Sequence, residues 1–300
     1  MGTLKTKIIS KDVAVNEAKY WSRFEEEVAR YGIPIWVDYQ KANTPEIGFI
    51  NFSTDPEIDR IVLGEIKDSF IKTVKGGKAL DLGCGAGWLC LEIARKGASA
   101  TGIDISPERI RKAKQYARQE GAEINYSIDD LEKLKWAKKG YYNVIVNWNS
   151  LHHVKNVEAV LLSIKNSLSS NGLFVSWDHL GDNFLLKSAT FFASLIPGYY
   201  KKKKDVLGSI HSESEGIAEI RLTEKVVAEY FQIKLFKRYL IFIHLLPPIY
   251  KYLKFKIGIP IPRNLFVAFL RVVGKIDRKL VSVVPFLATY SFFVGKKVER

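Results

Sequence analysis

The spacing of apolar side chains changes several times along the chain, and each change predicts an element. Residues 13–31 and 56–75 carry apolar side chains three to four positions apart with charged residues between them, which predicts two helices. From residue 78 to about residue 180, short apolar runs alternate with helical spacing, and this rhythm predicts a parallel α/β sheet. The predicted strands are residues 79–82, 98–105, 123–128, 142–147 and 173–177, and the predicted helices follow residue 87 and span 107–120 and 157–168.

Beyond residue 180 the rhythm changes. An apolar segment over 183–200 leads into the lysine run Lys201–Lys204. Thr223 is the predicted cap of a helix that ends near residue 231, because a threonine side chain there can accept a backbone N–H bond of the first turn. Two further strands are predicted at 235–243 and 289–298.

The stretch between these two strands, residues 245–288, is rich in Leu, Ile, Phe, Tyr and Lys, and prolines interrupt it. No run in the chain reaches the roughly 18–20 charge-poor apolar residues that span a bilayer. Apolar bulk with lysine at its borders is typical of helices lying on a membrane surface, and equally of a substrate cap or a dimer interface. All three interpretations stay open at the level of sequence.

A glycine-rich loop, Asp-Leu-Gly-Cys-Gly-Ala-Gly at residues 81–87, joins the first strand to the helix that follows. Glycine has no Cβ, so such a loop allows positive φ and the close approach of a ligand. The free N–H groups at the helix start add a positive potential. The spacing excludes a dinucleotide fingerprint, which needs a glycine where Trp88 stands, and the loop lacks the Gly-Lys-Ser/Thr end of a phosphate-binding P-loop.

This loop, with its acid two residues ahead, resembles motif I of the class I S-adenosylmethionine (AdoMet)-dependent methyltransferases, and the chain looks like the type 11 group that includes quinone-biosynthesis enzymes. The resemblance implies an α/β fold with a Rossmann-like, doubly wound, seven-stranded sheet, mostly parallel with the last strand antiparallel. It also implies an amino-terminal helical lid over residues 1–75 and an AdoMet-binding core over 76–182. Residues 183–300 would complete the core at about 221–244 and 289–298, with helical, basic and apolar cap insertions at 183–220 and 245–288.

The same resemblance assigns roles around AdoMet. The methionine part passes Gly83, Gly85 and Gly87, and Asp81 takes its ammonium. Asp104, 23 residues after Asp81 at the end of the second strand, accepts the ribose hydroxyls, as an acid there does in dinucleotide folds. The remaining assigned residues are Asp130 for the adenine amine (with Asp129 as the alternative), Leu131 for a ring nitrogen, Ile105 for packing against adenine, and Asn149 near the methionine end.

The segment Asn147–Val154 resembles the family's acceptor-facing loop, so His152 and His153 are candidate bases. His179 follows the fifth strand and is the third candidate. Tyr20, Trp21 and Trp36 are candidates for the lid, with ordinary core packing as the alternative. The sequence predicts no metal site.

The formal net charge of +14 is unevenly distributed. Residues 181–300 carry 21 basic and 9 acidic side chains, a net +12, whereas the first 180 residues carry 25 and 23, a net +2. The excess suggests attraction to an anionic surface, either lipid or nucleic acid. The two cysteines form no disulfide framework, which favours a cytoplasmic location. The basic excess adds to this expectation a peripheral position on the inner membrane face.

The function expected is methyl transfer from AdoMet to a small-molecule or lipid-like acceptor by in-line displacement, with S-adenosyl-L-homocysteine as product. The alternatives are a nucleic-acid (RNA) methyltransferase and a non-catalytic AdoMet-fold protein that contacts membranes or other proteins. The nucleic-acid alternative is less favoured, because strand four ends in Asn147-Trp148-Asn149 and lacks the Asn/Asp-Pro-Pro-aromatic sequence. A nicotinamide enzyme is disfavoured by the glycine spacing.

Overall fold

The structure, a computed structural model, describes residues 56–180 and 222–298 apart from 75, 134, 252 and 255–257, together with residues 15, 17–19 and 21–22 near the amino terminus. Tyr20, Trp36, the segment 183–220 and its lysine run Lys201–Lys204 lie outside the described residues.

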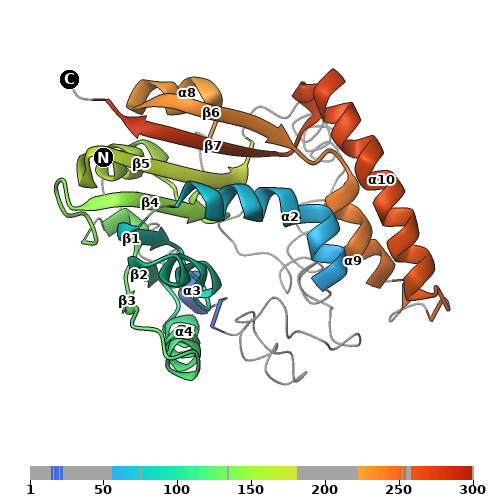
Figure 1. Cartoon of the computed structure of the whole chain (residues 1–300), viewed down its shortest axis with the longest axis horizontal. Helices are drawn as coiled ribbons and strands as arrows, with labels where there is room; N and C mark the ends of the chain where they lie inside the picture. The colour runs from blue at the N-terminus through green and yellow to red at the C-terminus, as the bar shows by residue number, and fades with distance from the viewer. Residues whose placement is uncertain are drawn as a thin grey trace, which may run out of the picture.

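A single seven-stranded sheet forms the centre of the described part, in the order β3-β2-β1-β4-β5-β7-β6 (Figure 1). The pairs among β1 to β5 are parallel, and β7 is antiparallel to both β5 and β6. The predicted fold class is confirmed, including the antiparallel last strand. The strands are β1 Gly77–Leu82, β2 Ala98–Asp104, β3 Asn125–Ile128, β4 Tyr142–Trp148, β5 Leu168–His179, β6 Phe231–Tyr239 and β7 Tyr290–Lys297.

Helices cover both faces of the sheet, because successive side chains of a strand point to opposite sides. On β4, Val144 and Val146 belong to one buried apolar cluster and Ile145 to the other. The first cluster receives α2 Pro56–Thr73, α3 Trp88–Arg95, α4 Pro107–Gln119 and α10 Arg263–Val283; the second receives α5 Val157–Ser167 and α8 Glu224–Tyr230.

Two predicted strand boundaries are wrong. β5 begins at Leu168, before the predicted 173, so Asn171 and Gly172, two residue types that favour turns, fall inside it. There the register shifts, with Leu168 opposite Tyr142 and Leu173 opposite Val144, so the turn-forming residues are absorbed as a bulge. β6 spans Phe231–Tyr239, earlier than the predicted 235–243. Phe231 packs against Phe174 with ring centroids 5.3 Å apart, and Leu240 ends the strand with a φ of 57°.

The connection between β6 and β7 is helical. It contains η4 Ile243–Leu245, α9 Leu246–Lys251, α10 and η6 Pro285–Leu287. The prolines bound α10 and do not break it: Pro262 is its cap, and Pro285 follows its end. No helix in the described part of the chain is long and apolar enough to cross a membrane.

α10 is held to the body of the fold by polar contacts at both ends. Arg263 and Arg271 pair with Glu57 at the start of α2. Near its other end the buried Asp277 accepts the backbone N–H groups of residues 241–243, at 2.9–3.2 Å, where the chain leaves β6. In Figure 1, α10 consequently stands beside the ends of β6 and β7, with α2 crossing the face of the sheet next to it.

Candidate functional site

The glycine loop bends back on itself at the carboxyl end of β1. Gly83, Gly85 and Gly87 all have positive φ, at 68°, 54° and 88°. A Cβ on Gly83 would meet Ser150 Oγ at 2.8 Å, and one on Gly87 would collide with the Tyr126 ring. Only Gly85 of the three leaves room for a side chain, since the nearest atom to its Cβ would be Arg109 Nη1 in ordinary contact at 3.7 Å. Bulk added at Gly85 would therefore project away from the loop's own packing, on the side where a ligand could approach.

Asp81 lies directly below this loop and is 2% exposed. Cys90 Sγ donates to its Oδ2 at 3.4 Å, while Oδ1 is buried without a hydrogen-bond partner among the described residues. Burial raises the pKa of Asp81 to about 7, with the Cys90 hydrogen bond lowering it and the charge of Asp104 adding to the rise. A buried carboxylate oxygen of this kind is suited to accept a cationic group, which would relieve the cost of its burial.

Asp104 ends β2 and is 5% exposed. Its Oδ2 accepts the Gly85 N–H at 2.9 Å, and its Oδ1 accepts the Ser106 N–H at 2.8 Å. The carboxylate thus ties the glycine loop to the start of α4, a role that the sequence did not reveal. Its role as acceptor of the ribose hydroxyls stays a prediction. Ile105, half-buried, is the next residue.

Asp129, Asp130 and Leu131 follow β3 beside the end of β2. The Asp129 N–H donates to the Asp104 carbonyl at 3.0 Å, which joins the two strand ends. Asp129 Oδ1 accepts the Asp130 N–H, and Asp130 Oδ1 accepts the Glu132 N–H in the short helix η2 Leu131–Lys133. The choice between the two acids at the adenine position stays a prediction.

Asn149 follows β4 in a left-handed conformation. Its φ is 57°, in a region that few residues other than glycine adopt and that asparagine tolerates better than most. Its N–H donates to the Trp177 carbonyl at 2.7 Å. Its side-chain Oδ1 is buried without a hydrogen-bond partner among the described residues. A buried polar atom without a partner calls for an explanation, and a bound ligand is one.

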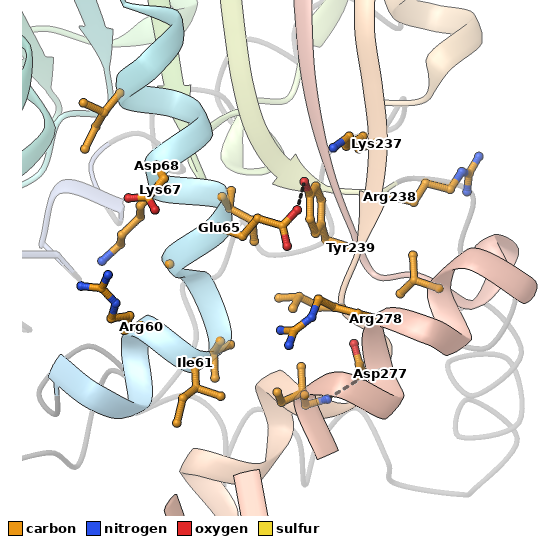
Figure 2. A pocket seen from close by; sticks show the side chains of 18 of the residues that line it. Arg60, Ile61, Glu65, Lys67, Asp68, Lys237, Arg238, Tyr239, Asp277 and Arg278 are labelled. Carbon is orange, nitrogen blue, oxygen red and sulfur yellow. Dashed lines mark hydrogen bonds between the residues drawn. The ribbon is translucent and has the colours of Figure 1, made fainter. Parts of the chain in front are cut away.

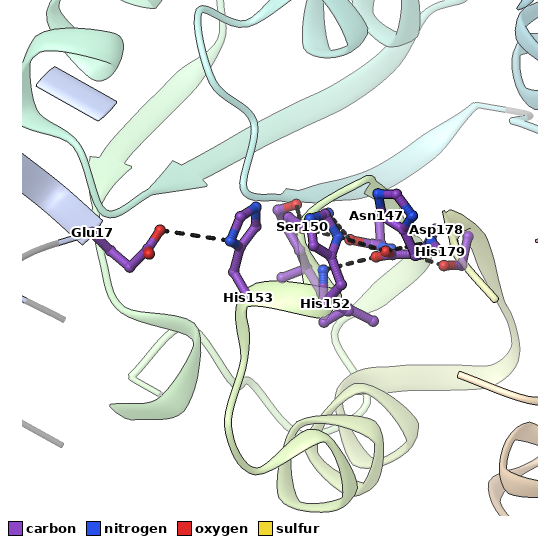
Figure 3. A network of polar contacts seen from close by, with 10 residues as sticks. Glu17, Asn147, Ser150, His152, His153, Asp178 and His179 are labelled. Carbon is purple, nitrogen blue, oxygen red and sulfur yellow. Dashed lines mark hydrogen bonds and ion pairs between the residues drawn. The ribbon is translucent and has the colours of Figure 1, made fainter. Parts of the chain in front are cut away.

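The three candidate histidines lie together around Asp178, which stands next to His179 at the end of β5 (Figure 3). The ring centroids of His152 and His153 are 4.0 Å apart, and those of His152 and His179 are 4.6 Å apart. His152 Nδ1 lies 2.7 Å from Asp178 Oδ1. The structure therefore brings together two segments that the sequence identified separately.

Asp178 is fully buried and organises this cluster. Its oxygens accept the Leu151 and His179 N–H groups at 2.8 and 2.7 Å and the Asn147 amide at 2.9 Å. Burial favours the protonated carboxyl, but these donors and the neighbouring histidines outweigh it and hold the pKa of Asp178 below its usual value. The sequence analysis gave Asp178 no role, although an acid at the end of a central strand was the available signal.

His153 has different surroundings. Burial, with the neighbouring His152, lowers its pKa well below the ordinary value, so this imidazole is neutral at pH 7. Its Nδ1 lies 3.7 Å from Glu17, and its ring meets Trp21 edge-on at 5.6 Å. The guanidinium of Arg109 stacks on the same Trp21 ring at 3.9 Å. Trp21 thus contacts His153 and Arg109, and its role as a lid stays a prediction. Glu17 and Arg109 had no sequence signal.

A large cavity of about 1410 Å³ lies between α2, β6 and α10 (Figure 2). Its lining mixes apolar and charged side chains, and Tyr239 Oη donates to Glu65 across it at 3.4 Å. Trp88, the first residue of α3 after the glycine loop, lines it and meets Trp148 edge-on at 5.1 Å. Trp148 precedes Asn149 in the chain, so this ring contact links the cavity lining to the site. Among the described residues, no group of His, Cys, Asp or Glu side chains is arranged to hold a metal ion.

Comparisons with known proteins agree with this geometry. Residues 58–200 match a family described as "Methyltransferase domain". The ubiquinone biosynthesis O-methyltransferase of Nitrosococcus oceani is 36% identical over 100 residues, which cover 33% of this chain and 42% of the relative. Its counterpart from Escherichia fergusonii is 30% identical over 134 residues, covering 43% and 56%. The chain thus spans about half the length of the curated relatives it matches.

Solved structures of low sequence identity share the fold. The geranyl diphosphate C-methyltransferase of Streptomyces coelicolor, solved with S-adenosyl-L-homocysteine, has a TM-score of 0.52 at 14% identity, over 95% of this chain and 98% of its own. Phosphoethanolamine N-methyltransferase 2 of Haemonchus contortus, solved with AdoMet, has a TM-score of 0.50 at 14% identity, over 78% and 53%. Together these matches support a class I AdoMet-dependent methyltransferase domain over residues 58–200, and AdoMet is the cofactor of that class.

Proposed function

We propose that the protein transfers a methyl group from AdoMet to a small-molecule acceptor. The observation that carries the proposal is the buried Oδ1 of Asp81, which has no hydrogen-bond partner among the described residues and belongs to the strand that leads into the glycine loop. AdoMet bears an ammonium, a carboxylate and a sulfonium, so a buried carboxylate beside a glycine loop and the start of a helix suits its amino-acid end.

The residues that would hold AdoMet follow from this fit. Asp81 would accept the ammonium, the start of α3 would face the carboxylate, and Asp104 would accept the ribose hydroxyls while its bond to the Gly85 N–H fixes the loop. Asn149 offers its unpartnered Oδ1 at the methionine end. Gly83, Gly87, Ile105, Asp130 and Leu131 complete the predicted set.

When bound, AdoMet supplies a methyl group on a sulfonium, which is already a good leaving group. The protein must then orient an acceptor and receive its proton; orientation alone can supply roughly 7–11 kcal/mol of a barrier. We infer that His152 is the base. Asp178 at its Nδ1 favours the tautomer with the proton there and the lone pair on Nε2, which then accepts a proton from a hydroxyl acceptor. His153 and His179 would shape the site beside it.

The acceptor class is the finer part of the proposal. The cavity beside Trp88 is large enough for an acceptor with an apolar tail, which supports the lipid-like alternative. The named activities of the relatives include O-, N- and C-methylation, so family membership leaves the acceptor atom open. Contact with an anionic membrane, and a peripheral cytoplasmic location, stay predictions supported by the basic carboxy-terminal part.

Three measurements test this function: cofactor binding, methyl transfer to an acceptor, and the effect of filling the cavity. Calorimetric titration with AdoMet and S-adenosyl-L-homocysteine should give saturable binding, and its absence from folded protein would refute the cofactor site. Methyl-labelled AdoMet, offered with a panel of hydroxyl-bearing aromatic and lipid-like compounds, should label an extractable product. Filling the cavity with Ile61→Trp should then raise the acceptor KM and leave the Kd for AdoMet unchanged, whereas Leu162→Trp on the exposed face of α5 should change neither.

A further inference from the structure

The helix α10 exposes a continuous apolar stripe to solvent. Large apolar side chains recur along it at intervals of three or four residues, which puts them on one side of the helix. Five of them are about half exposed or more: Leu265 61%, Phe269 53%, Val272 59%, Ile276 48% and Val283 70%. Leu280, between Ile276 and Val283, is 37% exposed, and Phe286, just beyond the helix, is 54% exposed. Scattered single apolar residues on a surface are normal, but a stripe along most of the length of one helix is not.

The stripe is separate from the face that α10 buries against the protein. The buried residues are Phe266, Val267, Leu270, Val273, Gly274 and Asp277. The first four stripe residues each stand next to one of these positions in sequence, so the apolar surface of α10 continues around the helix beyond the protein's edge. A surface helix of a globular protein needs only one apolar face, the one that it buries against the core. The exposed apolar stripe of α10 therefore requires a partner outside the described fold.

The charge on α10 identifies that partner. Its exposed charged side chains are all basic: Arg271, Lys275, Arg278 and Lys279. Its single acid, Asp277, is 1% exposed and occupied by backbone N–H groups. Apolar side chains bordered by cations, without exposed acids, match acyl chains beneath anionic headgroups. A nucleic acid would not use the stripe, and a second copy would bring the same cations toward one another.

We propose that α10 docks on an anionic lipid surface, with the Leu265–Val283 stripe inserted among the headgroups. This proposal is independent of the acceptor's identity. The helix is already fixed in place for such docking, because Phe266 stacks on Tyr250 at 4.0 Å and polar contacts through Glu57 and Asp277 hold both ends. Gly274 and Arg278 also line the large cavity, so docking would bring that cavity close to the lipid.

The proposal is tested with a fluorescent reporter on the stripe. Both native cysteines are buried, so a cysteine introduced by Phe269→Cys is the accessible one and takes a polarity-sensitive dye. Leu162→Cys, at a 48% exposed position of α5, is the matched control. We expect a blue shift for the dye at 269, and none at 162, with vesicles of phosphatidylcholine plus phosphatidylglycerol, and little response to phosphatidylcholine alone.

Two unlabelled variants separate charge from apolar contact in vesicle co-flotation. Lys275→Glu with Lys279→Glu should weaken binding to acidic vesicles at least about tenfold, because each cation near such a surface contributes about 1 kcal/mol. Phe269→Ser with Val272→Ser should weaken it comparably, while thermal unfolding and AdoMet titration verify that both variants fold. High salt should reduce the binding of the wild-type protein.

Three results would overturn the proposal. The wild-type chain could ignore acidic vesicles at low salt, or the dyes at 269 and 162 could respond equally, or both double variants could bind like wild type. A dimer in sedimentation that Phe269→Ser with Val272→Ser dissociates, combined with no vesicle binding, would assign the stripe to a contact between copies.

Discussion

The affinity of the protein for AdoMet should depend on pH through Asp81. Burial holds the pKa of this carboxyl at about 7 in the protein without ligand. An ammonium against Oδ1 would favour the ionised form, so binding below pH 7 must first remove a proton from Asp81. Affinity should therefore fall as the pH falls below 7, by up to tenfold per pH unit.

The magnitude follows from the ionised fraction. With a pKa of about 7, that fraction is about one half at pH 7.0 and about one thirtieth at pH 5.5, so the affinity should drop about 16-fold across this range. An ordinary α-amino group, with a pKa near 7.7–8.0, stays mainly protonated throughout, so the ligand adds little to the trend.

Calorimetry in two buffers of different ionisation enthalpy measures both the affinity for AdoMet and the number of protons released on binding. At pH 7.0, binding should release about half a proton, because about half of the Asp81 carboxyls are still protonated. Asp81→Asn should bind weakly at pH 7.0, and its affinity should be nearly flat between pH 5.5 and 7.0. A flat wild-type profile, or full affinity in the Asn variant, would refute the assignment of the ammonium to Asp81.

The same substitution should stabilise the protein without ligand. Raising the pKa of Asp81 from its ordinary 3.8 to about 7 corresponds to a cost on the order of 4 kcal/mol when the group is ionised, since each pKa unit is worth about 1.36 kcal/mol. The unfolded chain loses this proton near pH 3.8, and the folded chain only near pH 7. Stability from this group is present below pH 3.8 and falls as the pH rises to 7. Asp81→Asn should thus raise the Tm most above pH 7.

Three further substitutions test the site. Gly85→Val should abolish AdoMet binding in calorimetry; Gly97→Val imposes the same positive-φ strain in open space and should leave binding intact, so equal losses would contradict the loop assignment. Asp104→Ala should weaken binding at least about tenfold by freeing the loop and removing an acceptor, and unchanged affinity would move the ribose site elsewhere. Asp178→Ala should destabilise the fold by about 3–5 kcal/mol in urea unfolding, because it leaves several buried donors unpaired; a loss below about 1 kcal/mol would contradict its organising role.

The order of sheet and helix as far as β5 was predictable, because local apolar periodicity and the glycine loop carry that information. The boundaries at the carboxy-terminal end were not. Phe231 begins β6 because it packs across the sheet against Phe174, a contact far away in sequence. Likewise, the spacing of apolar residues in 263–283 is helical, but the nearby prolines suggested interruptions, whereas the structure places them at the two ends of α10.

For the site, residue types and their positions at strand ends predicted which side chains lie near one another, but not which hydrogen bonds each side chain makes. Asp104 was expected as a ribose acceptor, and its bonds to the Gly85 and Ser106 N–H groups depend on the exact turn of the loop. The link between His152 and Asp178 joins the ends of two strands, and no local pattern encodes such a distance. The roles of the candidate site residues stay predictions until binding is measured.

The position of β7 has a consequence for the order of folding. β7 follows every other described element in the chain, yet it lies between β5 and β6 in the sheet. Among the described strands β6 pairs only with β7, so it cannot join the sheet before β7 does. During synthesis the five parallel strands can assemble first, leaving the edge of β5 without a partner until residues 290–297 emerge. Closing the sheet then requires the α9–α10 connection to bring β7 back beside β5, a nonlocal step that should make the final stage slow and dependent on how early α10 settles on α2.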